Sequence, residues 1–228
     1  MTIAMNRRAL LGAATVGTAL AVGGTRAFAA DAEKPVFGPA PGVALLSRNE
    51  NPYGPAPSAV RAMADSASLG CYYANGGADR LTAMIAERFG VGKDQVVVGS
   101  GSTEVLNATI MAYMNKGAVV APELFWDTTV RFGVRKGAKL KSVPLAADMS
   151  IDLDGLAASY GPDVGMIHLC NPNNPTGMVL DGDKLRAFVR KLSPQTIVIV
   201  DEAYNELTDR PDYTSVAGLV KECPNLMV

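Results

Sequence analysis

Residues 196–204 read TIVIVDEAY, and the first five of them are apolar or β-branched without interruption. A short run of this kind is typical of a strand that is buried on both faces of a sheet. Such strands occur mainly in α/β proteins, where helices cover a parallel sheet from two sides. The stretch therefore predicts the α/β class, and it places a carboxylate, Asp201, directly after a buried strand.

The residues before and after this run alternate between short apolar segments and amphipathic ones. Further strands are predicted at 95–98, 118–121, 139–143 and 165–169, and residues 224–228 are expected to begin another. Apolar residues at helical spacing predict helices at 58–67, 78–89, 102–114, 127–134, 153–159 and 184–192. Strands separated by helices of this length form βαβ units. The expected architecture is a mostly parallel sheet with helices on both faces.

The composition favours a globular protein, because 48% of the 228 residues are hydrophobic. With 21 basic and 22 acidic residues the net charge is -1, so no general electrostatic field attracts the chain to nucleic acid or to an anionic membrane. Any anion site must therefore be local. The cysteines Cys71, Cys170 and Cys223 lack the spacing of metal ligands, so we expect free thiols and no metal site.

The first 29 residues have the features of an export signal. Arg7 and Arg8 precede a mildly apolar stretch, and residues 27–29 read AFA, a small-x-small pattern for cleavage before Ala30. The segment resembles a twin-arginine signal, which implies a periplasmic location. The apolar stretch at 10–24 is shorter than the ~20 residues of a membrane span, so no membrane association is expected after cleavage. The predicted organisation is a signal peptide at 1–29, an N-terminal arm at 30–54 and one large domain at 55–228.

Polar segments follow three of the predicted strands, at the edge where open α/β sheets bind their ligands. The first is GSGSTE at 99–104, where glycines permit a tight turn and Ser102 and Thr103 fall at the start of a helix. Free backbone N–H groups and the helix dipole make such a start an anion site. A Gly-Ser turn before a helix is also common without any ligand, so the segment alone leaves both interpretations open.

The other two segments are NPNNPTG at 171–177 and DEAY at 201–204. The asparagines of the former supply amide donors and acceptors at a strand end, although they also suit a turn that only caps its own backbone. Asp201 follows an apolar strand, and a buried carboxylate must be paired or hydrogen-bonded. Its alternative role is that of a helix N-cap.

Together, in this order and spacing, the three segments resemble those of fold-type-I pyridoxal-phosphate aminotransferases. The upstream segment NENPYGP at 49–55 is similar to that of the histidinol-phosphate aminotransferase group within them. The resemblance extends from about residue 45 to the end of the chain. It implies pyridoxal 5'-phosphate (PLP) as the cofactor.

The resemblance also implies a role for five residues in holding that cofactor. Ser102 and Thr103 would bind the phosphate, in agreement with the expected helix start. Asn174 would donate a hydrogen bond to the 3′-oxygen of the pyridine ring, and Tyr204 would assist at the same oxygen. Asp201 would pair with the pyridine nitrogen and keep it protonated, so that the ring accepts electrons when the substrate loses its α-proton.

The chain departs from the family pattern at two positions. The aromatic ring that stacks on the cofactor is expected two residues after Pro122, where this chain has Leu124. Phe125 and Trp126 follow directly, and of these we favour Trp126 for the stacking role, with a plain core aromatic as the alternative. Tyr73 matches a tyrosine that reaches the phosphate of the neighbouring subunit, but the proline that follows it in the family is missing. If Tyr73 reaches across, the protein is a homodimer. The only histidine, His168, is expected to be a sheet residue.

The expected reaction moves an amino group between an amino acid, of the histidinol phosphate or aromatic type, and a 2-oxo acid. In the family a lysine in a Ser-Lys segment after Asp201 holds the cofactor covalently, and no lysine of residues 1–228 has that context. We therefore expect the chain to be a fragment that is inactive alone. A decarboxylase or lyase of the same fold, or a non-catalytic PLP-binding domain, is the alternative function.

Overall fold

The computed structural model describes residue 44 and residues 46–74 and 76–228. The predicted twin-arginine signal, with Arg7, Arg8 and the cleavage site before Ala30, lies outside these residues. The chain divides into two compact units, and the boundary lies between Cys71 and Tyr72. Within the described residues, no helix is both long and apolar enough to cross a membrane.

The first unit contributes one helix and a short helical turn to the described chain. Helix α2 spans Pro57–Ser66 and continues into the 3-10 helix η1, Ala67–Cys71. Pro57 stands at the first helical position, where its missing N–H costs nothing. The predicted helix at 58–67 is thereby confirmed to within one residue.

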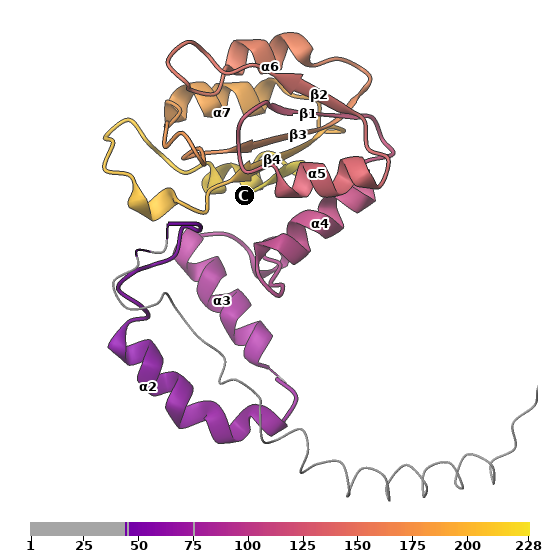
Figure 1. Ribbon diagram of the computed structural model, residues 1–228. Helices are drawn as coiled ribbons and strands as arrows, with labels where there is room; N and C mark the ends of the chain where they lie inside the picture. The colour runs from indigo at the N-terminus through magenta and orange to yellow at the C-terminus, as the bar shows by residue number, and fades with distance from the viewer. Residues whose placement is uncertain (1–43, 45, 75) are drawn as a thin grey trace, which may run out of the picture. The chain divides into compact units, whose positions relative to one another are not determined.

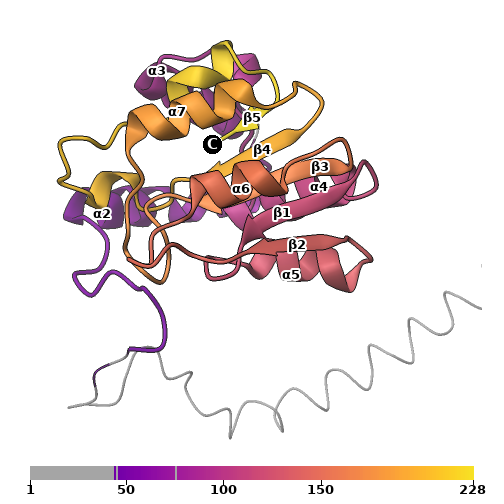
Figure 2. The ribbon, with the colours of Figure 1, turned by 90° about the horizontal axis from the view of Figure 1, so that it is seen from above.

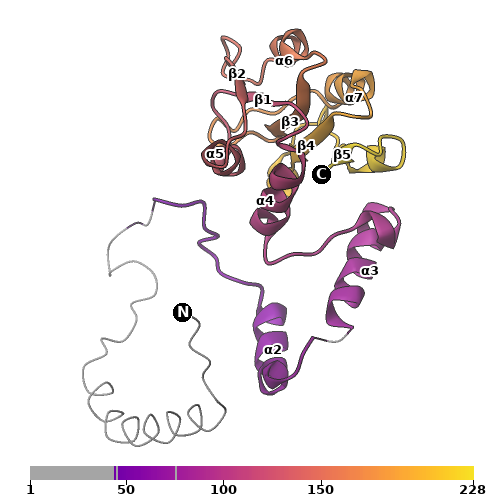
Figure 3. The same cartoon turned by 90° about the vertical axis from the view of Figure 1, so that its right-hand side faces the viewer.

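The second unit is built on a five-stranded parallel sheet with the order β2-β1-β3-β4-β5. The strands are β1 (Ala118–Pro122), β2 (Leu140–Val143), β3 (Val164–Cys170), β4 (Ile197–Asp201) and β5 (Leu226–Met227). In β3 every residue is buried, and in β4 all but the last. The sheet, seen along its strands in Figure 3, confirms the α/β class.

Helices cover both faces of this sheet, as the sequence predicted (Figures 1 and 2). One face packs against α6 (Leu153–Ser159) and α7 (Gly182–Lys191), and its core includes Leu156 and Leu185. The other face packs against α4 (Ser102–Tyr113) and α5 (Thr128–Arg135), with Ile110 and Val130 in its core. The remaining elements are α3 (Gly77–Phe89) and the 3-10 helices η2 (Lys93–Gln95), η3 (Asn205–Leu207) and η4 (Ala217–Lys221).

Alternation along β3 directs its side chains to the two cores in turn. Ile167 and Leu169 belong to the α6–α7 core, whereas Met166 and Cys170 belong to the α4–α5 core. His168 has the same parity as Met166 and contacts Phe125 of the α4–α5 core. The expectation that His168 is a sheet residue is confirmed, since it lies in the middle of β3 and is fully buried.

The predicted strand at 95–98 is wrong. Residues 93–95 form η2, and Val96 has the extended dihedral angles φ -118° and ψ 128° without a strand partner in the described chain. Val97 is left 74% exposed. The β-branched run fixes an extended local conformation, but a strand also needs a neighbour to complete its hydrogen bonds.

Candidate functional site

The carboxyl ends of the central strands bring the predicted site segments to one edge of the sheet. Strands β3 and β4 pair in register down to Cys170 and Asp201, and the Asn171 N–H donates to the Asp201 carbonyl at 2.9 Å. The segments 171–177 and 201–204 therefore start side by side. Strand β1 pairs with the other side of β3, and residues 123–126 follow the end of β1.

The start of α4 has the geometry that an anion site requires, although no strand precedes this helix among the described residues. Gly101 has φ 76° and ψ 163°, and helix α4 begins at Ser102 with no side chain capping its first turn. Ser102 and Thr103 are exposed. Glu104 also lies in this turn and accepts a hydrogen bond from the Ser100 N–H at 2.5 Å, so its negative charge competes with a bound anion for the helix dipole.

A cavity of about 440 Å³ connects this helix start with the end of β4. Ser102 and Asp201 both line it, together with apolar side chains of α3, α4 and β5 such as Phe89, Leu106 and Met227. Two of the predicted site residues thus face one space. Asn174, Tyr204 and Trp126 are not among its lining residues.

The three asparagines of the 171–177 loop have different roles. The Asn171 side-chain oxygen accepts from the Leu180 N–H at 2.8 Å, which closes the loop at its base. The Asn173 side-chain amide donates to the Leu124 carbonyl at 3.1 Å and to the Thr176 hydroxyl at 3.0 Å. The Asn171 contact fits the interpretation of a turn that caps nearby backbone, whereas Asn173 ties the loop to the segment after β1. The Asn174 amide instead donates to the Tyr204 hydroxyl at 3.2 Å.

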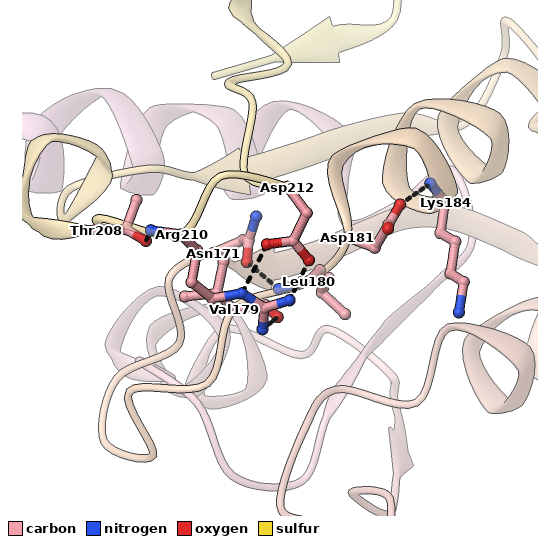
Figure 4. Close-up of polar contacts among 8 residues, drawn as sticks. All are labelled: Asn171, Val179, Leu180, Asp181, Lys184, Thr208, Arg210 and Asp212. Carbon is pink, nitrogen blue, oxygen red and sulfur yellow. Dashed lines mark hydrogen bonds and ion pairs between the residues drawn. The ribbon is translucent and has the colours of Figure 1, made fainter.

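The base of this loop is also held from outside (Figure 4). The Arg210 guanidinium donates to the Val179 carbonyl at 3.1 Å and forms an ion pair with Asp212. Because the Asp212 carbonyl accepts from the Gly182 N–H at 3.2 Å, the segment around Arg210 is attached at two points. These contacts fix the loop that carries Asn174. No motif in the sequence indicated these contacts.

Asp201 is a partly buried carboxylate without a cationic partner among the described residues. Loss of solvent raises its pKa, and a hydrogen bond from the Ala203 N–H at 3.1 Å opposes this rise. The N-cap alternative is wrong: the next helical element is η3, and Tyr204 occupies its N-cap position. A cationic donor placed at Asp201 would relieve the cost of its burial.

Glu202, the next residue, has a structural role that the sequence did not indicate. Its carboxylate accepts from the Ser215 hydroxyl at 2.5 Å and from the Val216 N–H at 2.8 Å. Burial raises the pKa of Glu202, and these hydrogen bonds counteract the shift. Both oxygens of Glu202 therefore accept hydrogen bonds within the fold, whereas the Asp201 carboxylate can still bind a ligand.

The aromatic positions separate into a buried ring and an exposed one. Phe125 is 6% exposed and packs edge-on against His168, whereas Trp126 and Leu124 are each 39% exposed. Phe125 thus takes the core role, and Trp126 is the ring left on the outside of the β1 end. Tyr73 is 94% exposed, and its predicted contact with a neighbouring subunit stays a prediction.

Several known proteins are similar to this chain over most of its length. A family model described as aminotransferase class I and II matches residues 41–228. The chain is 34% identical over 188 residues to a histidinol-phosphate aminotransferase of Brevibacillus brevis, with 82% of this chain and 51% of that protein covered. It is 36% identical to histidinol-phosphate aminotransferase 2 of Nitrosospira multiformis, covering 80% and 47%. The chain thus spans about half the length of these relatives.

Solved structures give the same result. A putative histidinol-phosphate aminotransferase from Erwinia carotovora superimposes with a TM-score of 0.74 at 30% identity, covering 78% of this chain and 53% of that one. A histidinol-phosphate aminotransferase from Sinorhizobium meliloti, solved in complex with pyridoxal-5'-phosphate, has a TM-score of 0.71 at 29% identity. The superposition covers 78% of this chain and 48% of the Sinorhizobium meliloti chain. The resemblance expected from about residue 45 onward is confirmed, since the family model matches residues 41–228.

Proposed function

Because this chain belongs to the aminotransferase class I and II family, we propose that the protein carrying it transfers an amino group from an amino acid to a 2-oxo acid with PLP. The observation that carries the proposal is the hydrogen bond from the Asn174 amide to the Tyr204 hydroxyl at 3.2 Å, which joins the loops that follow the adjacent strands β3 and β4. Asp201 lies at the end of β4, three residues before Tyr204. Since the chain spans about half the length of its relatives, the proposal concerns the whole protein.

The residues present fit the chemical groups of PLP. A protonated pyridine nitrogen is a cationic donor, which is what the desolvated Asp201 carboxylate lacks. The Asn174 amide and the Tyr204 hydroxyl offer donors to the ring oxygen. The uncapped N–H groups at Ser102 and Thr103 suit a phosphate, with Glu104 as the opposing charge.

Each of these residues acts on the bound ring in a different way. When bound, PLP supplies an electron sink for the bond at the substrate's α-carbon. Asp201 holds the proton on the pyridine nitrogen and thereby keeps the sink effective. Asn174 and Tyr204 orient the ring through its oxygen, and the start of α4 anchors the other end. Trp126 is proposed to cover one face of the ring.

Two types of amino-group donor are compatible with the proposal. The relatives are named for histidinol phosphate, which supports that substrate type. Arg7 and Arg8 instead suggest export, away from the cytoplasm, and support an aromatic amino acid. The protein is further proposed to be a homodimer in which Tyr73 reaches the neighbouring subunit.

Replacing Asn174 by alanine tests the proposed cofactor site. We expect the chain to bind PLP about ten- to a hundredfold more weakly, because a hydrogen bond to an ionised oxygen is worth roughly 1.5–3 kcal/mol. Equilibrium dialysis with PLP absorbance measures this change. Asn115→Ala, an exposed asparagine after α4, is the control and should bind like the wild type. Equal affinity in Asn174→Ala and the wild type would remove Asn174 from the site.

Export makes a separate prediction. Replacing Arg7 and Arg8 by lysine should leave the protein in the cytoplasm, since the paired arginines are the proposed signal. Arg26→Lys, outside the pair, should not affect export. Cell fractionation and N-terminal sequencing are the measurements, with a mature protein that begins at Ala30. Periplasmic delivery of the double variant would contradict the prediction.

A further inference from the structure

His168 is a polar side chain buried without a partner. It is fully buried in the middle of β3, and neither of its ring nitrogens has a hydrogen-bond partner among the described residues. Burying such groups costs free energy that a leucine at the same place would not incur. The position therefore retains an imidazole despite its cost.

The ring contact of His168 is with Phe125. The two ring centroids lie 5.1 Å apart with an interplanar angle of 90°, the edge-to-face geometry that aromatic pairs prefer. Phe125 is the buried member of the segment 124–126, between the half-exposed Leu124 and Trp126. His168 thus supports the only buried ring of this segment.

A second contact fixes the same segment from the same strand. The Asn173 side-chain amide, just beyond the end of β3, donates to the Leu124 carbonyl at 3.1 Å. The backbone before Trp126 is therefore held by a hydrogen bond at Leu124 and by a ring contact at Phe125. Trp126 itself follows these two attachment points and is 39% exposed.

We propose that His168 is a positioning residue whose ring, through Phe125, sets the place of Trp126 at the edge of the sheet where PLP binds. The inference rests on the proposed function for the role of Trp126 toward the cofactor. The contact that places Trp126 does not depend on the ligand. His168 itself touches neither substrate nor cofactor.

Protonation of His168 should weaken this support. Burial lowers the pKa of His168 from 6.5 to about 4, because the charged ring has no solvent. The support is fully present above pH 6.5, where an unfolded histidine is also neutral, and it is lost as the pH falls through about 4.

The charged groups on the surrounding elements do not offset this loss. On α4 and α5 they are exposed, as Glu104 and Arg131 are. In the segment after β1, Asp127 pairs with Arg131, and Glu123 is exposed. Strand β1 contains no charged residue. On β3, burial raises the pKa of the Cys170 thiol to about 12, so that this side chain stays neutral. The charged residue of β4 is Asp201, at the end of the strand.

Trp126 provides the readout, because it is the only tryptophan of the chain. Its emission and its quenching by PLP are to be recorded for the full 228-residue chain, for His168→Leu and for His168→Phe. Met166→Leu is the matched control: it lies on the same strand and in the same core, and it is equally buried. Phe125→Leu removes the other ring of the pair and serves if His168→Leu does not fold.

We expect His168→Leu and Phe125→Leu to shift the Trp126 emission and to weaken PLP binding by about three- to tenfold, the worth of an edge-to-face pair. His168→Phe should keep both properties and lose the emission change that the wild type shows as the pH falls through about 4. Met166→Leu should behave as the wild type. This pattern supports the proposal, because a purely structural role would affect Met166→Leu equally.

Failure of the inference and failure of the proposed function give different results. If the wild type binds PLP and both His168→Leu and Phe125→Leu match it in emission and affinity, the positioning role is overturned. If the wild type does not bind PLP, the proposed function fails, and the emission of the free chain decides the inference. A shift in His168→Leu but not in Met166→Leu then supports it, and unchanged emission overturns it.

Discussion

Replacing Asp201 by alanine is expected to lower the rate of amino-group transfer by the whole protein about a hundredfold or more, as removal of one preorganised charged group does in other enzymes. The reason is electronic, because without the carboxylate the pyridine nitrogen of PLP loses its proton partner. Binding should be affected less, since Asn174, Tyr204 and the start of α4 are unchanged. Single-turnover kinetics with PLP at saturation separates the two effects.

The neutral variant Asp201→Asn is the matched test of charge. Since burial already raises the pKa of Asp201, the unbound protein should tolerate this change, and thermal unfolding checks that the fold is intact. Its activity should fall as in Asp201→Ala. Asp154→Ala, an exposed aspartate in the first turn of α6, should retain full activity. If Asp201→Asn stays within a few-fold of the wild type, the hydrogen bond from Ala203 is the whole role of Asp201.

Residues 1–228 alone are expected to show no amino-group transfer at all. No lysine among them has the Ser-Lys context that the family uses to hold the cofactor, so PLP would be held only by non-covalent contacts. Incubation with PLP, reduction with borohydride and mass spectrometry measure covalent attachment. Only scattered, substoichiometric adducts should appear. A stoichiometric adduct on one lysine, with turnover of an amino acid, would show that a lysine of this chain is catalytic.

The sheet and its helices could be predicted from the sequence because their patterns are local. The run 196–200 and the segments 118–121 and 165–169 become strands within a residue or two of the expected bounds, and 153–159 is a helix as predicted. A strand that is buried on both faces of the sheet needs a continuous apolar run, and such a run can be recognised from the strand's own residues. The exception, 95–98, shows the limit, since strand pairing depends on a neighbour that the segment itself does not specify.

The site was predictable only in part, for the same physical reason. Ser102 begins a helix and Asn174 meets Tyr204, as the resemblance implied. Other roles depend on contacts between residues that are 9 to 49 positions apart in the sequence. These are the roles of Asn171 and Asn173 in the loop, the attachment of that loop by Arg210, and the structural role of Glu202. No pattern in the sequence marks such contacts.

The most direct test of the central claim is the protonation state of the pyridine nitrogen in PLP bound to this chain. PLP labelled with ¹⁵N at the ring nitrogen can be followed by NMR in the wild type and in Asp201→Asn, at a pH where the free cofactor has lost this proton. Our account predicts the chemical shift of a protonated nitrogen in the wild type and of an unprotonated one in Asp201→Asn. An unprotonated nitrogen in the wild-type complex would contradict it.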